Sequence, residues 1–200
     1  MNPVDERPVD GPEASRLVVL AVLFEAGLAP LALVLGRILN QPPLAGFAWS
    51  MWDACLGAVA TLPMLALLAI VVRWPVGPLG PIKQFFDREV RPLLRTRPWY
   101  DLALISIAAG VGEEMLFRGV IQGALSHALG QTAGLVVASL IFGALHPITR
   151  AYTVLAAALG AYLGGTWLFT GNLLSAMVTH GLYDFVALIV LLRDAPPKGS

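Results

Sequence analysis

Two long apolar stretches in the first half of the sequence most constrain what this chain can fold into. Leu17–Leu39 and Met51–Val72 each reach the roughly 20 apolar residues that an α-helix needs to cross the hydrocarbon core of a bilayer. Hydrophobic residues make up 57% of the chain and charged residues only 13%, which lies outside the range of soluble domains. The sequence therefore predicts an all-α membrane protein.

The remaining apolar segments predict four further helices, at 101 to about 129, 131–146, 151–169 and 173–192. Between the second and third helices, Arg73–Arg97 is rich in Pro, Gly and basic residues, with apolar residues at helical spacing. This composition is typical either of a helix lying on the membrane surface or of a solvated basic loop. The expected fold is a polytopic bundle of about six transmembrane helices plus an interfacial helix. Nothing separates a second domain, so residues 1–200 are predicted to form one membrane domain.

The distribution of basic residues predicts the orientation of the chain. If the N-terminus is cytoplasmic, Arg37 is the only Lys or Arg beside a helix end on the outer side, while Arg118 lies inside the third helix. This bias favours six crossings with both termini in the cytoplasm. Residues 1–16 are acidic and rich in proline, unlike a signal peptide, and are predicted to form a flexible cytoplasmic tail. The abundance of Arg, Ala, Leu and Gly is typical of a bacterial protein. The expected location is therefore the bacterial inner membrane, with the lipid bilayer as a partner.

The chain has equal numbers of acidic and basic residues, so its net charge is zero. No basic run with interleaved aromatic residues appears, and no nucleic-acid partner is expected. Its single cysteine, Cys55, can form neither an intramolecular disulfide nor a cysteine cluster for a metal.

Three ionisable residues fall within the third apolar helix: Glu113, Glu114 and Arg118. Such residues are costly in a membrane and usually face the interior of a bundle or a wet cavity. At a spacing of i,i+4, Glu114 and Arg118 share one face of the helix and can pair, which suggests a structural role. Glu113 points away from Arg118, and a buried carboxyl without a partner on its own helix is suited to serve as a general base.

Histidines accompany the fourth and sixth helices. His146 precedes Pro147 at the end of the fourth helix, where a histidine taken alone is more often a capping or interfacial residue than a catalytic one. His180 and Asp184 lie at i,i+4, so they can share a hydrogen bond that fixes the imidazole tautomer or simply packs the helix. Counted from the cytoplasmic helix ends, Glu113 and His180 both lie about 18–20 Å deep and could meet. The same count places His146 closer to the cytoplasmic surface.

In order along the chain, these residues resemble the three motifs EExxxR, FxxxH and Hxxx(N/D) of the CAAX-protease and bacteriocin-processing family of intramembrane endopeptidases. The matching positions are Glu113, Glu114 and Arg118, then Phe142 and His146, then His180 and Asp184. The resemblance covers residues 101–192, which it identifies as the expected catalytic core.

The resemblance implies roles for these residues. Glu113 and His146 would activate a water for attack on a peptide carbonyl, and His180 with Asp184 would stabilise the oxyanion, while Glu114 and Arg118 would hold the site together. The chain departs from many members at Asp184, because an ionised carboxylate can only accept a hydrogen bond whereas Asn can also donate one.

The resemblance leaves the cofactor open. The family is often labelled metalloprotease, and Glu113, His146 and His180 would be the ligands of a zinc ion. The sequence has no HExxH pair, and members of this fold are also described as glutamate peptidases. A reaction without a metal or other cofactor is favoured, with zinc as the alternative.

Two other functions fit the same fold. Non-catalytic members serve as immunity-type or scaffold proteins that bind other membrane proteins. A proton-coupled transporter would use Glu25 and Asp53 with the buried histidines as a relay, although no broken-helix repeat is present. The favoured function is endopeptidase, acting on a membrane-associated protein or peptide.

Overall fold

The computed structural model describes residues 12–193, and within this range the chain is helical with no strand. Four of its helices are long and apolar enough to cross a membrane: α1 (Pro12–Ile38), α2 (Met51–Arg73), α8 (Arg150–Thr170) and α9 (Leu173–Arg193). The predicted class, a polytopic helix bundle, is confirmed. The expected number of six crossings stays a prediction.

The first helix begins earlier than the sequence suggested. Residues 1–11 of the expected tail lie outside the described residues, but residues 12–16 form the first turns of α1 rather than a tail. Pro12 at the first helical position and Glu13 in the first turn both favour a helix start there, because proline needs no N–H partner and an acidic group complements the helix dipole.

The predicted long third helix is present as one rod made of α5 (Trp99–Glu114), η3 (Met115–Gln122) and α6 (Gly123–Leu129). The middle segment, η3, is a π-helix, which the sequence did not predict. Such wide turns occur frequently at functional sites. Gly130, with φ of 89°, reverses the chain into the short helix α7 (Gln131–Ala144).

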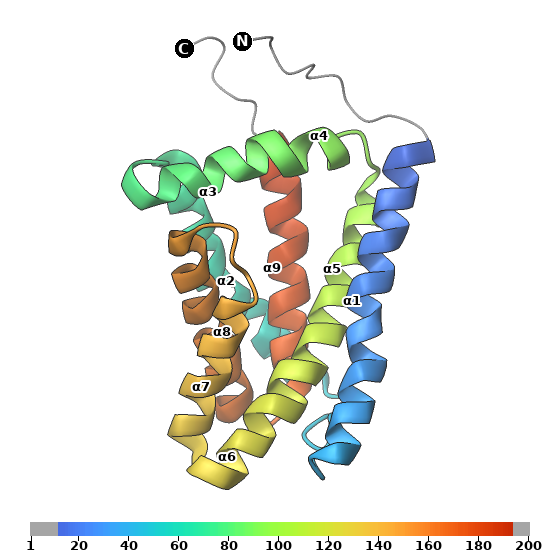
Figure 1. Ribbon diagram of the computed structural model, residues 1–200, viewed down its shortest axis with the longest axis vertical. Helices are drawn as coiled ribbons and strands as arrows, with labels where there is room; N and C mark the ends of the chain where they lie inside the picture. The colour runs from blue at the N-terminus through green and yellow to red at the C-terminus, as the bar shows by residue number, and fades with distance from the viewer. Residues whose placement is uncertain (1–11, 194–200) are drawn as a thin grey trace.

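The basic segment between α2 and α5 is helical, which decides between its two predicted forms. It consists of η1 (Gly77–Leu79), α3 (Gly80–Phe85), η2 (Phe86–Val90) and α4 (Arg91–Leu94). Figure 1 shows this segment lying across one end of the bundle, at a steep angle to the long helices. The interpretation as a solvated loop is therefore wrong.

Arg91 anchors this segment to the bundle. It is buried, pairs with Asp87 at 2.7 Å and donates from Nη2 to the Leu191 carbonyl at 2.6 Å. The contact satisfies a carbonyl in the last turn of α9, where a cation also complements the helix dipole. The start of α1 and the end of α9 lie at this same end of the bundle (Figure 1). An even number of crossings follows if every long helix spans the bilayer.

Glycines set the closest helix crossings near the ionisable residues. A Cβ at Gly110 of α5 would lie 2.8 Å from the Gly181 nitrogen of α9, and a Cβ at Gly112 would collide with the Glu25 carbonyl oxygen of α1. Membrane helices commonly use small residues for such close backbone approach. These two crossings bring α1 and α9 against the stretch of α5 that carries Glu113 and Glu114.

Candidate active site

The two neighbouring glutamates at the end of α5 occupy different environments. Glu114 has no exposed surface, and its Oε1 lies 3.2 Å from Arg118 Nη1 and 2.8 Å from His180 Nδ1. The contact with Arg118 is the i,i+4 pair that the sequence predicted. The contact with His180 joins α5 to α9 and was not predicted, because spacing along one helix carries no information about a neighbouring helix.

Arg118 connects three parts of the bundle from a position that is 2% exposed. Besides Glu114, it donates from Nη2 to the Gly160 carbonyl of α8 at 2.9 Å, and its guanidinium carbon lies 4.6 Å from the centre of the Phe142 ring of α7. A charge so deeply buried is tolerated because it is paired and hydrogen-bonded. The contacts suit the supporting role expected for Glu114 and Arg118, which stays a prediction.

His180 lies between two carboxylates. Its Nδ1 contacts Glu114 at 2.8 Å and its Nε2 faces Asp184 Oδ2 at 3.4 Å, so the predicted pair on α9 is present but is the longer of the two contacts. Carboxylates only accept hydrogen bonds, and a neutral imidazole donates from one nitrogen only. The shorter contact therefore assigns the proton of a neutral His180 to Nδ1, on the side of Glu114.

His146 lies just beyond α7, in the connection to α8. Its Nδ1 is 2.7 Å from the Phe142 carbonyl, and its ring stacks on the Phe142 ring at 4.5 Å. Since a carbonyl can only accept, Nδ1 donates, and the other nitrogen of a neutral imidazole is left as the proton acceptor. This is the tautomer that a general base requires.

One internal cavity collects most of the predicted catalytic residues. It has a volume of about 250 Å³, is bordered by α3 at one end, and is lined by Glu113, His146 and Asp184 among others. The short α7 explains how His146 reaches it despite its predicted position near the surface. His180 does not line the cavity, but it contacts Asp184, which does.

The cavity also contains Glu25 of α1, which the sequence analysis assigned only to a transporter relay. Glu25 and Glu113 both line this cavity, and Oε2 of each is buried without a hydrogen-bond partner. The other acidic residue of that relay, Asp53, does not line the cavity and accepts a hydrogen bond from Asn172 at 2.9 Å. The only signal for Glu25 in the sequence was an acidic residue inside an apolar helix.

The geometry does not favour a metal centre among the described residues, 12–193. No three or more His, Cys, Asp or Glu side chains are grouped there in a way that could hold a metal ion, and this includes Glu113, His146 and His180, the ligands of the zinc alternative. Both nitrogens of His180 already face carboxylates.

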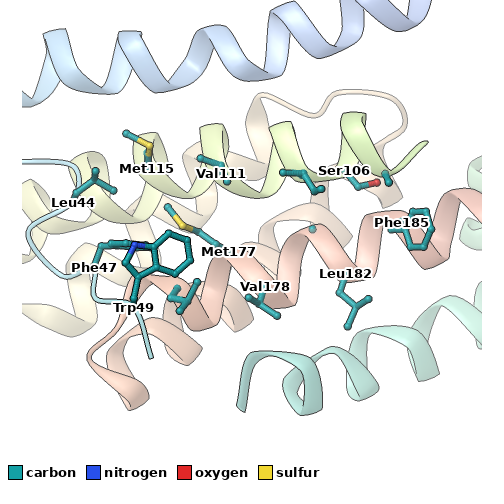
Figure 2. A pocket seen from close by; sticks show the side chains of 14 residues that line it. Leu44, Phe47, Trp49, Ser106, Val111, Met115, Met177, Val178, Leu182 and Phe185 are labelled. Carbon is teal, nitrogen blue, oxygen red and sulfur yellow. The ribbon is translucent and has the colours of Figure 1, made fainter. Parts of the chain in front are cut away.

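A second hollow lies on the opposite side of α5 and α9. Figure 2 shows this groove, which has a volume of about 580 Å³ and is apolar apart from Ser106. Phe47 and Trp49, from the connection between α1 and α2, line it and pack edge to face at 5.2 Å. None of the predicted site residues lies in it.

Fold and site together define a membrane-embedded helix bundle with carboxyl and imidazole groups around an internal cavity. Residues 95–186 match the family model described as type II CAAX prenyl endopeptidase Rce1-like, so this region of the chain is similar to that family. The match confirms the resemblance and contains every predicted site residue. The chain matches no curated protein and no solved structure.

Proposed function

We propose that this chain is an intramembrane endopeptidase that hydrolyses a peptide bond of a membrane-associated protein or peptide. The observation that carries the proposal is the presence of Glu113, His146 and Asp184 on the wall of one internal cavity, with His180 contacting Asp184. The Rce1-like match supports a proteolytic reaction at this site.

In the proposed reaction, a water in the cavity is the nucleophile. Glu113 and the unprotonated nitrogen of His146 are the acceptors for its proton as it attacks the peptide carbonyl, and the same proton then passes to the leaving amine. In its protonated form His180 keeps one N–H on the side of Glu114 and donates from Nε2 to the developing oxyanion, a form of stabilisation that is strongest in a site from which bulk water is excluded.

Asp184 has a different role from an asparagine at the same position. As a carboxylate it accepts from His180, so it orients and stabilises the charge on that ring rather than donating to the oxyanion itself. Asp184→Asn is expected to keep cleavage within a few-fold of wild type, because the amide still contacts His180 and adds a donor.

The proposal includes a membrane setting. The chain is a multi-pass protein of a bacterial inner membrane with six crossings and cytoplasmic termini. In that orientation α3 and the cavity beside it lie toward the cytoplasm, where a membrane-associated substrate would enter.

The decisive test is cleavage of a proteome-derived peptide library by the purified protein in detergent, with and without a chelator. Glu113→Gln should lower cleavage by about 10²- to 10⁴-fold, the usual contribution of a general base. Glu13→Gln is the matched control, because Glu13 is an exposed glutamate at the start of α1, and it should cleave as wild type does.

The outcomes separate the alternatives. Activity that survives the chelator supports the metal-free reaction, whereas loss restored by zinc would assign a metal to the site. A folded wild-type protein that cuts no peptide but retains another membrane protein on co-purification, with Glu113→Gln retaining it equally, would instead establish the immunity- or scaffold-type function.

A further inference from the structure

A tyrosine on the wall of the internal cavity has a hydroxyl without a partner in the protein. Tyr152 of α8 lines the cavity, and its hydroxyl makes no hydrogen bond to any of residues 12–193. By contrast, the hydroxyl of Tyr162, on the same helix, donates to the Ala60 carbonyl of α2 at 2.8 Å. Tyrosine hydroxyls inside proteins usually find a partner. The hydroxyl of Tyr152 is therefore a donor for a molecule bound in the cavity.

The position of Tyr152 is fixed from several sides. Its backbone N–H donates to Thr149 Oγ1 at 3.0 Å, which caps the start of α8. Its ring packs edge to face on Phe86 of η2, with ring centres 6.4 Å apart, and its centre lies 6.4 Å from that of the His146 ring. A donor that is held in place before the reaction needs no reorganisation when charge develops beside it.

The other polar groups of the cavity are mostly hydrogen-bond acceptors. Glu113 and Asp184 only accept as carboxylates, and the free nitrogen of His146 accepts as well. Among the described residues that line the cavity, Lys83 is the only Lys or Arg, and it is bound to Asp87 at 2.9 Å. The oxygen of a peptide carbonyl is itself an acceptor. A substrate in this cavity therefore needs a donor that these groups do not supply.

Tyr183 of α9 also lines the cavity without a hydrogen bond from its hydroxyl. Its ring packs against the core cluster of Leu68, Ala187 and Leu191. The ring of Tyr152 instead lies beside His146, the proposed acceptor for the proton of the attacking water. Since the water and the carbonyl that it attacks must lie about 3–3.5 Å apart, a donor to that carbonyl belongs near the base. Of the two tyrosines, Tyr152 is the better placed.

We propose that Tyr152 is a further catalytic residue: its hydroxyl donates a hydrogen bond to the oxygen of the scissile peptide carbonyl, and this bond strengthens as the oxyanion forms. The hydroxyl keeps its proton throughout, so the proton of the attacking water still passes to the leaving amine. Tyr152 thus adds a donor from α8 to the one that His180 supplies from α9. This inference rests on the proposed peptidase function.

Tyr152→Phe is the direct test, because it removes the hydroxyl and keeps the ring. It should lower kcat by about 10²- to 10³-fold, the usual loss on removing one donor to an oxyanion. KM should change by less than about threefold, because the bond forms fully only in the transition state. The unfolding temperature in detergent should not fall, since the deleted hydroxyl has no partner in the protein.

Tyr162→Phe is the matched control, because it makes the same change on the same helix. It removes the hydrogen bond to Ala60, so it should lower the unfolding temperature and leave kcat unaltered. The two variants are thus expected to show opposite patterns. A loss of kcat of the predicted size in Tyr183→Phe, with wild-type kcat in Tyr152→Phe, would overturn the assignment to Tyr152.

A substrate with a thioamide at the scissile bond separates donation to the carbonyl from mere packing against His146. Sulfur accepts hydrogen bonds weakly, so the loss of kcat caused by Tyr152→Phe should shrink to less than about tenfold on this substrate. A residue that only holds the His146 ring would cause the same loss with either substrate. Equal losses on the amide and the thioamide would therefore overturn the proposal.

The same measurements distinguish failure of this inference from failure of the peptidase proposal. A folded wild-type protein that cleaves no peptide would reject the peptidase function, and the role of Tyr152 with it. Cleavage by wild type that is matched by Tyr152→Phe would reject the role of Tyr152 alone.

Discussion

The two hollows on either side of α5 and α9 differ in size and in chemistry. The apolar groove has about 580 Å³ and the cavity about 250 Å³, yet Glu25, Glu113, His146 and Asp184 all line the smaller one. An apolar groove on a membrane helix costs little, because lipid chains are as apolar as its walls. Ionisable groups within the membrane raise the free energy of the folded protein. Their concentration in the cavity therefore identifies the functional site better than the volume of either hollow does.

Helices α5 and α9 line both the cavity and the groove, because the side chains of a helix point outward in all directions around its axis. On α9, Asp184 and Leu191 line the cavity, whereas Val178 and Leu182 line the groove (Figure 2). Helical periodicity alone thus separates a polar face from an apolar one. Substitutions on the two faces should have unequal effects.

The largest effect on stability is expected from Arg118→Ala on the polar side. It would leave Glu114 buried with a negative charge and without its cationic partner, and breaking a buried ion pair typically costs about 3–5 kcal/mol. Thermal unfolding in detergent measures the loss, with Arg150→Ala, an exposed arginine at the start of α8, as the control. Equal unfolding temperatures for the two variants would contradict the supporting role of Arg118.

A smaller loss is expected from Gly112→Ala, which tests the crossing of α1 and α5. The added methyl group collides with the Glu25 carbonyl, and overpacking of this kind costs about 1–3 kcal/mol. Gly165→Ala is the matched control, because a Cβ at Gly165 of α8 meets no atom within 4 Å. The difference in unfolding temperature between the two glycine variants measures the tightness of the crossing, and no difference would show that α1 is not held there.

The smallest effect is expected in the apolar groove. Leu182 is 37% exposed, so Leu182→Ala should change the free energy of unfolding by no more than about 0.5 kcal/mol and leave cleavage unchanged. Leu191, on the same helix, is 6% exposed, and Leu191→Ala should cost about 2–5 kcal/mol. A large loss of cleavage in Leu182→Ala with normal stability would make the groove part of the functional site.

The sequence by itself determined the features that depend on neighbouring positions in one helix. The positions of the long helices follow from apolar length, and the contacts Glu114–Arg118 and His180–Asp184 follow from i,i+4 spacing. The family motifs identified the region that matches the Rce1-like model. Each of these is a local property that helix geometry fixes before any packing.

Only the tertiary structure decided which helices meet and which groups share the cavity. Glu114 of α5 contacts His180 of α9, and Glu25, Glu113 and His146 come from separate parts of the chain to line one cavity. These contacts depend on close crossings at Gly110 and Gly112 and on the short length of α7. The periodicity of one helix determines which face a residue lies on, but packing between helices determines what that face meets.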